Sequence, residues 1–297
     1  MKRVAVIGAG TMGNGIAHVF SQHDINVTLI DIQQELLDQA ITIIRKNMER
    51  ELRKEKITSE QMSAAISNIT TSTSISDAAD WDFVIEAASE ELTLKLNIFQ
   101  QLDRICRSEV ILATNTSSIS ITKIAAATSR PDKVIGMHFM NPVPVMKLVE
   151  AIRGVATSES TYITVEQLAK KLNKVPVEVN DYPGFVANRI LMPMINEAIY
   201  ALFDGVASVE AIDTIMKLGM SHPMGPLTLA DFIGLDVCLA ILEVMHEDLG
   251  FSKYNPCVLL RKMVEAGYYG KKSGRGFYDY TDPKNPKPSV HTGCTFK

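Results

Sequence analysis

Short apolar runs separated by helical patterns fill the first half of the chain. We predict seven strands there, each from an apolar run of strand length: Val4–Ile7, Val27–Ile30, Ile69–Ile75, Phe83–Glu86, Val110–Thr114, Val134–Met137 and Val145–Ile152. Helical patterns lie between most of the earlier runs. Strands that alternate with helices are typical of an α/β fold with a mostly parallel, doubly wound sheet.

The pattern changes near residue 182. A last strand-like run, Val175–Val179, leads into the segment Asn180–Gly184, where proline and glycine interrupt regular structure. From Val186 to about Gly270 the pattern is helical only. We therefore predict a sheet domain over residues 1–182 and an all-helical domain over residues 183–281. Because residues 282–297 lack apolar periodicity, we expect a disordered tail there.

A glycine-rich block follows the first predicted strand and leads into a helical pattern. Glycines at this spacing, between a strand and a helix, are typical of a turn that binds the pyrophosphate of a dinucleotide. The helix N-terminus adds free N–H groups and a partial positive charge. An ordinary strand–turn–helix is the alternative. We predict a Rossmann-type domain with these cofactor-binding residues: Gly8, Ala9, Gly10, Thr11, Met12 and Gly13.

Asp31 lies at the end of the second predicted strand, eighteen residues after Gly13. A carboxylate at this point accepts hydrogen bonds from the adenosine ribose hydroxyls and repels a 2′-phosphate. The next residues, Ile32, Gln33 and Gln34, provide no cation for such a phosphate. The predicted cofactor is therefore NAD(H) rather than NADP(H).

Composition narrows the possible partners. The chain has 297 residues and a net charge of −4, which gives no sign of a nucleic-acid partner. Its longest apolar runs have strand length, so we expect no membrane span. The first strand starts at residue 3, which leaves no room for a cleaved signal sequence. Four cysteines without metal-ligand spacing suit a reducing cytoplasm and predict no metal site: Cys106, Cys238, Cys257 and Cys294.

The crossover between Asp31 and the weak strand at Ile69 is unusually long. We predict a helical extension over about residues 35–68, rich in helix formers from Glu35 to Lys56. It carries a cluster of cations: Lys46, Arg50, Arg53, Lys54 and Lys56. One interpretation is a solvated helix face, since acidic residues lie among these cations. The other is a site for the phosphate-bearing tail of an anionic substrate.

A histidine and a glutamate mark the strongest catalytic candidate. His138 lies at the end of a predicted strand, where open α/β sheets hold their ligands. Glu150 follows twelve residues later in a second strand-like run. A hairpin around Asn141–Pro144 would bring the two side chains together. A carboxylate fixes the orientation of an imidazole and raises its basicity, as proton abstraction from a hydroxyl requires. A lone histidine at a strand end is, alternatively, structural.

Two further positions carry groups able to bind substrate. Ser117 lies in the polar turn Ala113–Ser118, after a predicted strand, where its hydroxyl could bind a substrate oxygen or the nicotinamide ribose. Alternatively, Ser117 or Ser118 caps a helix from Ile119 onward. Asn188 lies at the start of the second domain, where its amide could face a cleft or serve only as a cap.

These residues resemble the L-3-hydroxyacyl-CoA dehydrogenase family, nearest to its bacterial 3-hydroxybutyryl-CoA members. The run from His138 to Glu150, HFMNPVPVMKLVE, is specific to that family. The resemblance extends in order from residue 2 to about residue 280. It also includes five further segments: Gly8–Gly13, Asn115–Ser118, Pro183–Arg189, His222–Pro226 and Gly270–Tyr278.

The resemblance implies an oxidoreductase that interconverts (S)-3-hydroxyacyl-CoA, with short chains such as 3-hydroxybutyryl-CoA favoured, and 3-ketoacyl-CoA. It implies His138 as general acid/base with Glu150 as its partner, and Ser117 and Asn188 near the reacting oxygen. Implied NAD contacts are Asp31, Glu90, Lys95, Ser117, Asn141 and Lys272. Implied contacts to the coenzyme A substrate are Arg50, Lys54 and Ser117.

Two other functions are compatible with a Rossmann-type domain, and the second domain also carries a prediction about assembly. A 3-hydroxyisobutyrate- or gulonate-type dehydrogenase would share the fold but would not need the cationic extension. An NAD-binding sensor would not need His138 or Glu150. Three long apolar helices in the second domain, together with the resemblance, predict a homodimer or a higher homo-oligomer that forms through this domain: Ile190–Phe203, Val209–Leu218 and Leu227–His246.

Overall fold

The computed structural model describes residues 2–290, and the chain divides into two compact units between Tyr182 and Pro183. Each unit has its own hydrophobic core. No helix within the described residues combines the length and apolarity needed to cross a membrane.

The first unit is built on an eight-stranded sheet in the order β3-β2-β1-β4-β5-β6-β7-β8. Its strands are β1 (Arg3–Ile7), β2 (Asn26–Ile30), β3 (Ile69–Ser72), β4 (Phe83–Glu86), β5 (Ile111–Thr114), β6 (Val134–Phe139), β7 (Leu148–Arg153) and β8 (Val175–Asn180). All neighbouring strands are parallel except β6 and β7. The strand order reverses between β1 and β4, which is where such sheets bind ligands.

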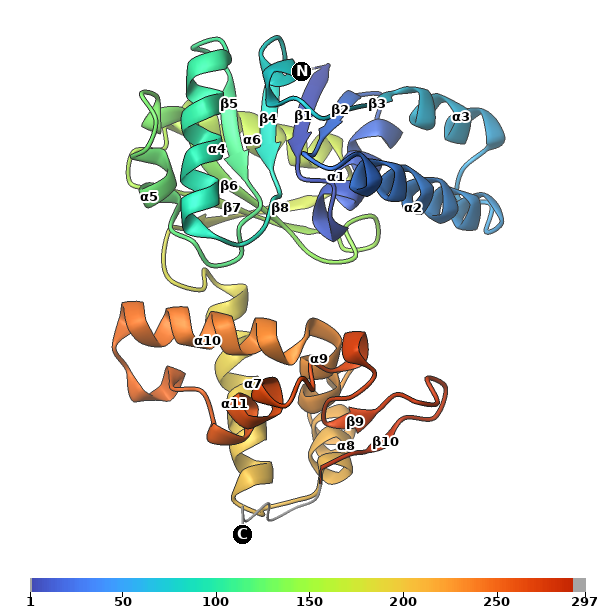
Figure 1. Ribbon diagram of the computed structural model, residues 1–297, viewed down its shortest axis with the longest axis vertical. Coiled ribbons are helices and arrows are strands. Elements are labelled where there is room, and N and C mark those ends of the chain that lie inside the picture. Colours follow the sequence, from blue (N-terminus) through green and yellow to red (C-terminus); the bar gives the residue numbers. More distant parts are fainter. Residues whose placement is uncertain (1, 291–297) are drawn as a thin grey trace. The chain divides into compact units, whose positions relative to one another are not determined.

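Helices cover both faces of this sheet (Figure 1). They are α1 (Thr11–Gln22), α2 (Gln34–Leu52), α3 (Ser59–Ser67), α4 (Leu92–Ile105), α5 (Ile121–Ala125) and α6 (Glu159–Lys171). Side chains of α1 and α6 share one core with alternate residues of the strands. Figure 1 shows α4 on the near face of the sheet and α6 on the far face.

Side-chain alternation assigns the polar candidates to the other face. Met137 and Phe139 of β6 belong to the core shared with α1 and α6. His138 lies between them, so its side chain points to the opposite face. Glu150 pairs with His138 in the antiparallel register of β6 and β7 and therefore shares that face.

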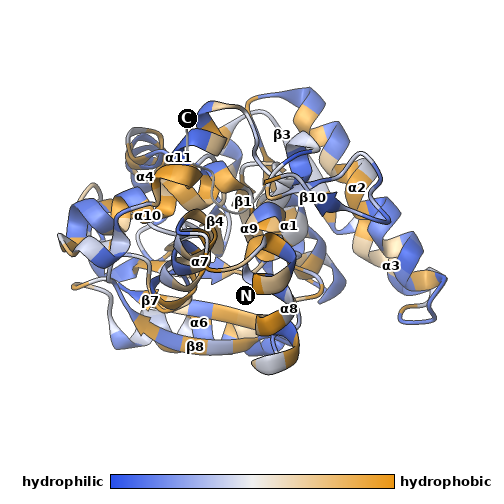
Figure 2. Ribbon diagram, turned by 90° about the horizontal axis from the view of Figure 1, so that it is seen from below, coloured by the Kyte–Doolittle hydropathy of each residue, from blue (hydrophilic) through white to orange (hydrophobic). Residues whose placement is uncertain are grey.

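The long crossover folds as two helices rather than one. α2 ends at Leu52, and α3 begins after a capping box in which Thr58 and Gln61 exchange hydrogen bonds. Leu37, Ala40, Ile44 and Met48 form the buried side of α2, at helical spacing. Hydrophobic and hydrophilic residues accordingly alternate along the α2 ribbon (Figure 2).

The second unit is mainly helical. Its elements are α7 (Ala187–Phe203), α8 (Val209–Gly219), α9 (Pro226–Ile233), α10 (Leu235–Leu249), α11 (Val258–Glu265), β9 (Tyr278–Asp279) and β10 (Lys287–Pro288). The predicted single helix Leu227–His246 is wrong: Gly234 adopts a φ of +109° and separates α9 from α10. A residue in that conformation cannot continue a right-handed helix.

The expectation of disorder from residue 282 is also corrected for the residues that the structure describes. Strand β10 pairs with β9 in an antiparallel hairpin, and the backbone N–H of Ser289 donates to Phe277 O at 2.9 Å. These backbone hydrogen bonds order the segment although its sequence lacks apolar periodicity. The rest of the predicted tail, residues 291–297, lies outside the described residues.

Candidate active site

The glycine-rich turn between β1 and α1 has the close packing that its sequence predicts. Gly8 adopts a φ of +101°, a conformation that favours glycine. A Cβ on Gly13 would lie 1.8 Å from the carbonyl oxygen of Gly8, so only glycine lets the helix approach the strand this closely. α1 begins at Thr11, directly after Gly10. Its N-terminus can therefore present backbone N–H groups to an anion.

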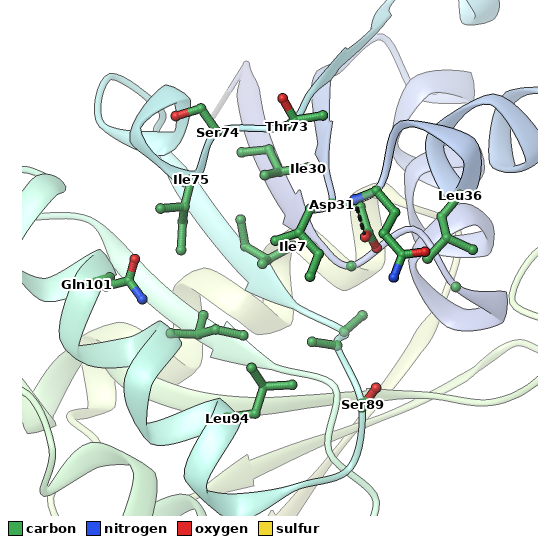
Figure 3. Close-up of a pocket in the computed structure, with 17 residues that line it drawn as sticks. Ile7, Ile30, Asp31, Leu36, Thr73, Ser74, Ile75, Ser89, Leu94 and Gln101 are labelled. Carbon is green, nitrogen blue, oxygen red and sulfur yellow. Dashed lines mark hydrogen bonds between the residues drawn. The ribbon is translucent and has the colours of Figure 1, made fainter.

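A cavity of about 590 Å³ opens beside this turn, at the carboxyl ends of β1, β2 and β4 (Figure 3). Gly8, Gly10, Asp31 and Ala88 are among the residues that line it. The Asp31 carboxylate accepts hydrogen bonds from the backbone N–H of Ala9 at 2.8 Å and of Gln33 at 3.2 Å. These two bonds hold the carboxylate at the cavity. The turn, the cavity and the carboxylate together fit a dinucleotide.

His138 and Glu150 form the predicted pair. Their side chains lie on β6 and β7 in direct register, and Nδ1 of His138 is 2.8 Å from Oε2 of Glu150. Both side chains are buried. When Nδ1 carries a proton, it donates a hydrogen bond to the Glu150 carboxylate, which leaves Nε2 as the nitrogen able to exchange a proton.

Ser117 lies on the other side of the imidazole. Its Oγ is 3.1 Å from Nε2 of His138. The alternative interpretation of Ser117 or Ser118 as a helix cap is not met, because α5 begins at Ile121 and Ser120 accepts the capping hydrogen bond from Lys123 N. Ser117 instead lies in the turn between β5 and α5, next to the histidine.

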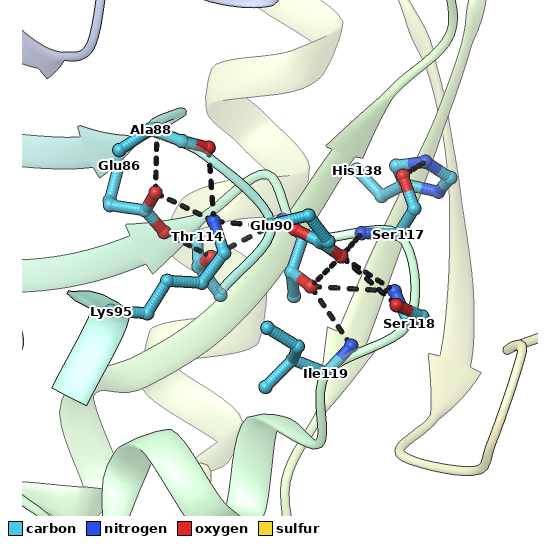
Figure 4. Close-up of polar contacts among 10 residues, drawn as sticks. Glu86, Ala88, Glu90, Lys95, Thr114, Ser117, Ser118, Ile119 and His138 are labelled. Carbon is cyan, nitrogen blue, oxygen red and sulfur yellow. Dashed lines mark hydrogen bonds and ion pairs between the residues drawn. The ribbon is translucent and has the colours of Figure 1, made fainter. Parts of the chain in front are cut away.

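A charge network, buried at Glu86 and Lys95 and reaching solvent at Glu90, supports this turn (Figure 4). Glu90 Oε1 accepts hydrogen bonds from the backbone N–H of Ser117 at 2.8 Å and of Ser118 at 3.0 Å, and from the hydroxyl of Thr116. Burial opposes ionisation of Glu90, but the Lys95 ammonium and these hydrogen bonds outweigh it, and they lower the pKa of the carboxyl group. Glu90 therefore acts as an anion that fixes the backbone of the Ser117 turn.

Lys95 joins Glu90 to a second, fully buried carboxylate. Its Nζ is 2.7 Å from Oε1 of Glu86 and 3.4 Å from Oε2 of Glu90. Glu86 also accepts hydrogen bonds from Ala88 N–H and the hydroxyl of Thr114, each at 2.7 Å. The network thus connects the cavity, which Ala88 lines, with the turn that contacts His138.

Sequence reasoning missed two residues of this arrangement. Glu86 carries a signal in the sequence, because a carboxylate in a buried parallel strand indicates a buried partner. Asn115 carries no such signal: its Oδ1 accepts a hydrogen bond from the backbone N–H of Phe139 at 2.9 Å and so ties the Ser117 turn to β6. No spacing rule in the sequence indicates this second contact.

The other predicted site residues lie in separate places. Arg50 and Lys54 are exposed, one in the last turn of α2 and the other just after it. Asn141 is exposed in the loop between β6 and β7. In the second unit, Asn188 is buried in the first turn of α7, and Lys272 is ion-paired with Asp236. Their contacts with substrate or cofactor remain predictions.

Comparisons with known proteins agree with this geometry. Residues 3–182 match the model of the NAD-binding domain of 3-hydroxyacyl-CoA dehydrogenase, and residues 184–280 match that of its C-terminal domain. The chain is 56% identical over 282 residues to the probable 3-hydroxybutyryl-CoA dehydrogenase of Bacillus subtilis, covering 95% of this chain and 98% of that protein. It is 52% identical over 289 residues to the 3-hydroxybutyryl-CoA dehydrogenase of Bradyrhizobium diazoefficiens, covering 97% and 98% respectively.

A solved structure extends the likeness to three dimensions. The (S)-3-hydroxybutyryl-CoA dehydrogenase of Ralstonia eutropha has a TM-score of 0.92 to this chain at 51% identity, covering 95% of this chain and 100% of that one. The matches confirm the predicted fold class, the NAD-dependent dehydrogenase activity and the NAD(H) cofactor, and they leave the sensor and the other dehydrogenase types without support. The chain belongs to the 3-hydroxyacyl-CoA dehydrogenase family.

Proposed function

We propose that this protein interconverts (S)-3-hydroxybutyryl-CoA and acetoacetyl-CoA with NAD(H). The relatives described above carry the name 3-hydroxybutyryl-CoA dehydrogenase at 51% to 56% identity. The observation that carries the proposal is the pairing of His138 with Glu150 at 2.8 Å, at the carboxyl end of β6, with Ser117 Oγ 3.1 Å from the other imidazole nitrogen. This arrangement supplies a proton acceptor with a fixed orientation.

The proposed chemistry divides between the chain and its cofactor. Bound NAD(H) would supply the hydride chemistry at C3 of the hydroxyacyl group. His138 Nε2 takes the proton of the C3 hydroxyl, and the Glu150 carboxylate stabilises the imidazolium that forms. Ser117 donates a hydrogen bond to the same oxygen. Asn188, in the first turn of α7, is a further proposed contact of the substrate or cofactor. In the reverse direction His138 returns the proton to that oxygen.

The cofactor contacts are part of the same proposal. The turn from Gly8 to Gly13 holds the pyrophosphate, and Asp31 accepts the ribose hydroxyls of the adenosine. Glu90, Lys95, Asn141 and Lys272 contact the remainder of NAD(H). The cavity beside Asp31 and the anchored Ser117 turn support these assignments.

The cationic end of α2 is the proposed site for the phosphates of coenzyme A. Arg50 and Lys54 are exposed, and neither forms an ion pair with another residue between positions 2 and 290. Unpaired cations on a helix remote from His138 are suited to the distal end of a long anionic substrate.

We further propose a cytoplasmic homodimer that assembles through the second unit.

Initial rates with NADH test the activity. We expect rapid oxidation of NADH with acetoacetyl-CoA and slower turnover of longer 3-ketoacyl-CoAs, measured by the absorbance of NADH at equal enzyme concentration. NADPH serves as the matched control for the cofactor. Turnover only with long-chain substrates would contradict the proposed substrate, and absence of turnover with every 3-ketoacyl-CoA would contradict the proposed reaction.

A further inference from the structure

Lys174 is a buried lysine close to the site. It lies between α6 and β8, and only 8% of its surface is exposed. Within the part of the chain that the structure describes, no carboxylate forms an ion pair with it. Burial without an anion lowers the pKa of its ammonium group. Lysine is almost never buried without a partner, so this position calls for an explanation.

The ammonium group of Lys174 holds one specific loop. Nζ donates to the carbonyl oxygen of Val143 at 2.5 Å and to that of Met146 at 2.8 Å. Both carbonyls belong to the loop that joins β6 to β7. The same loop meets β8 through the hydrogen bond from Val175 N to Lys147 O at 2.7 Å. Lys174 thus ties the loop to the start of β8.

The held loop joins the two strands that carry the catalytic pair. It begins directly after Phe139, two residues beyond His138, and it ends at the start of β7, where Leu148 lies two residues before Glu150. Its other side packs on α1, where a Cβ added to Gly15 would lie 2.9 Å from Cβ of Val143. The loop is therefore fixed between the helix that follows the glycine-rich turn and Lys174, and it carries Asn141.

We propose that Lys174 is a positioning residue for the dehydrogenase reaction: its ammonium group fixes the β6–β7 loop and, through it, the alignment of His138 and Glu150 with the bound cofactor. The inference rests on the proposed function. Two charge-assisted hydrogen bonds to neighbouring carbonyls restrain the loop more strongly than neutral donors would. Since a small misplacement of reacting groups costs up to about 100-fold in rate, the loss should appear in the chemical step.

The test compares Lys174→Met, which keeps the stem and removes the charge and the donors, with Lys174→Arg, which keeps both. Lys171→Met is the matched control, because Lys171 is an exposed lysine three residues earlier in the last turn of α6. Each variant is assayed for the single-turnover rate of NADH oxidation by acetoacetyl-CoA, for KM, for the Kd of NADH and for Tm. All rates are measured well below the Tm of the least stable variant.

We expect Lys174→Met to lower the single-turnover rate by about 10-fold or more, with KM for acetoacetyl-CoA within about 2-fold of wild type. Lys174→Arg should recover most of that rate, and Lys171→Met should match wild type. If Lys174→Met does not fold, Lys174→Gln takes its place; since its amide keeps neutral N–H donors, it should lower the rate less than Lys174→Met but still below that of Lys174→Arg.

Two results would overturn the inference alone: a wild-type rate in folded Lys174→Met, or a loss that falls on KM and Tm with the chemical step unchanged. Either would make Lys174 purely structural. An inactive wild-type protein would instead overturn the proposed function and, with it, the inference.

Discussion

At the scale of single residues, a few side chains define the chemistry because the backbone presents each at a set point. His138 and Glu150 face each other because two antiparallel strands place them in register, which a spacing of twelve residues permits but does not require. Ser117 reaches the imidazole because Glu90 and Asn115 hold its turn. Each of these contacts needs the right side chain and also a backbone that places it within hydrogen-bond distance of its partner.

Asp31 should determine cofactor choice. Its carboxylate is held beside the cavity by Ala9 N–H, and Ile32 next to it is exposed and available for a cation. We expect wild type to prefer NADH over NADPH in kcat/KM, since the carboxylate repels a 2′-phosphate. Asp31→Ser combined with Ile32→Arg should narrow that preference, with Ile32→Arg alone as the control. A wild-type enzyme that prefers NADPH would contradict the role of Asp31.

The role of a residue could be predicted from the sequence where the residue belongs to a recognisable motif. It could not be predicted where the role depends on a contact with a residue that is distant in the sequence. The glycine turn, Asp31, His138 and Glu150 belong to the first kind. Glu86 and Lys174 belong to the second, because their partners lie on other strands and loops and no local pattern encodes those contacts.

At the scale of elements, hydrophobic periodicity predicted which segments form strands of the sheet, but it predicted the residues at which elements begin and end less accurately. The eight observed strands overlap the eight predicted ones, but β7 starts at Leu148 rather than Val145. Val145 and Met146 both donate backbone hydrogen bonds to Pro142 O, so they form a turn in spite of their apolar side chains. The break at Gly234 was likewise missed, because apolar residues continue on both sides of it.

The end of α2 should bind the remote part of the substrate. Arg50→Ala with Lys54→Ala should raise KM for acetoacetyl-CoA several-fold, because the two cations attract the phosphates of coenzyme A. The effect should weaken with added salt, which screens exposed charges. KM for NADH, and turnover of a short thioester without the nucleotide, should not change. Arg45→Ala is the control for loss of a cation from α2. Equal losses of activity with both thioesters would show that Arg50 and Lys54 only form a solvated helix face.

Asp231 should make the stability of the second unit depend on pH. Burial raises the pKa of this carboxyl group to about 6, although it accepts hydrogen bonds from Phe277 N–H and Tyr278 N–H, each at 2.9 Å. A raised pKa means that the folded state binds the proton more tightly than the unfolded state does. The stability contribution is therefore complete below about pH 4 and is lost as the pH rises through about 6.

The comparison of wild type with Asp231→Asn isolates this contribution. As the pH falls from 7 to 5, the free energy of unfolding of wild type should rise relative to that of the variant, measured by urea denaturation. The full difference is at most about 3 kcal/mol. A difference that stays constant or moves the other way over this range would contradict the assignment.

At the scale of the whole molecule, the division into two units follows from a local signal, since the Pro183-Gly184 interruption ends the sheet unit at Tyr182.

Assembly is a prediction of the same scale. Leu218 at the end of α8 is 80% exposed, and Ile215 and Met220 near it are also exposed. Apolar side chains gathered on one helix are typical of a covered interface.

We expect wild type to have the mass of a dimer by light scattering at micromolar concentration. Leu218→Asp should shift the population toward the monomer, because a charge at the interface would lose its hydration. Val155→Asp is the control, since Val155 is an exposed apolar residue of the first unit, at 91%. A strictly monomeric wild type would rule out the proposed dimer.

The central claim is that His138, oriented by Glu150, moves the proton during hydride transfer. The most direct test is the single-turnover rate of NADH oxidation by saturating acetoacetyl-CoA in wild type and His138→Gln, alongside the Kd of NADH. The account predicts a rate at least ~100-fold lower in the variant, with the Kd of NADH nearly unchanged. A variant that oxidises NADH at the wild-type rate would contradict it.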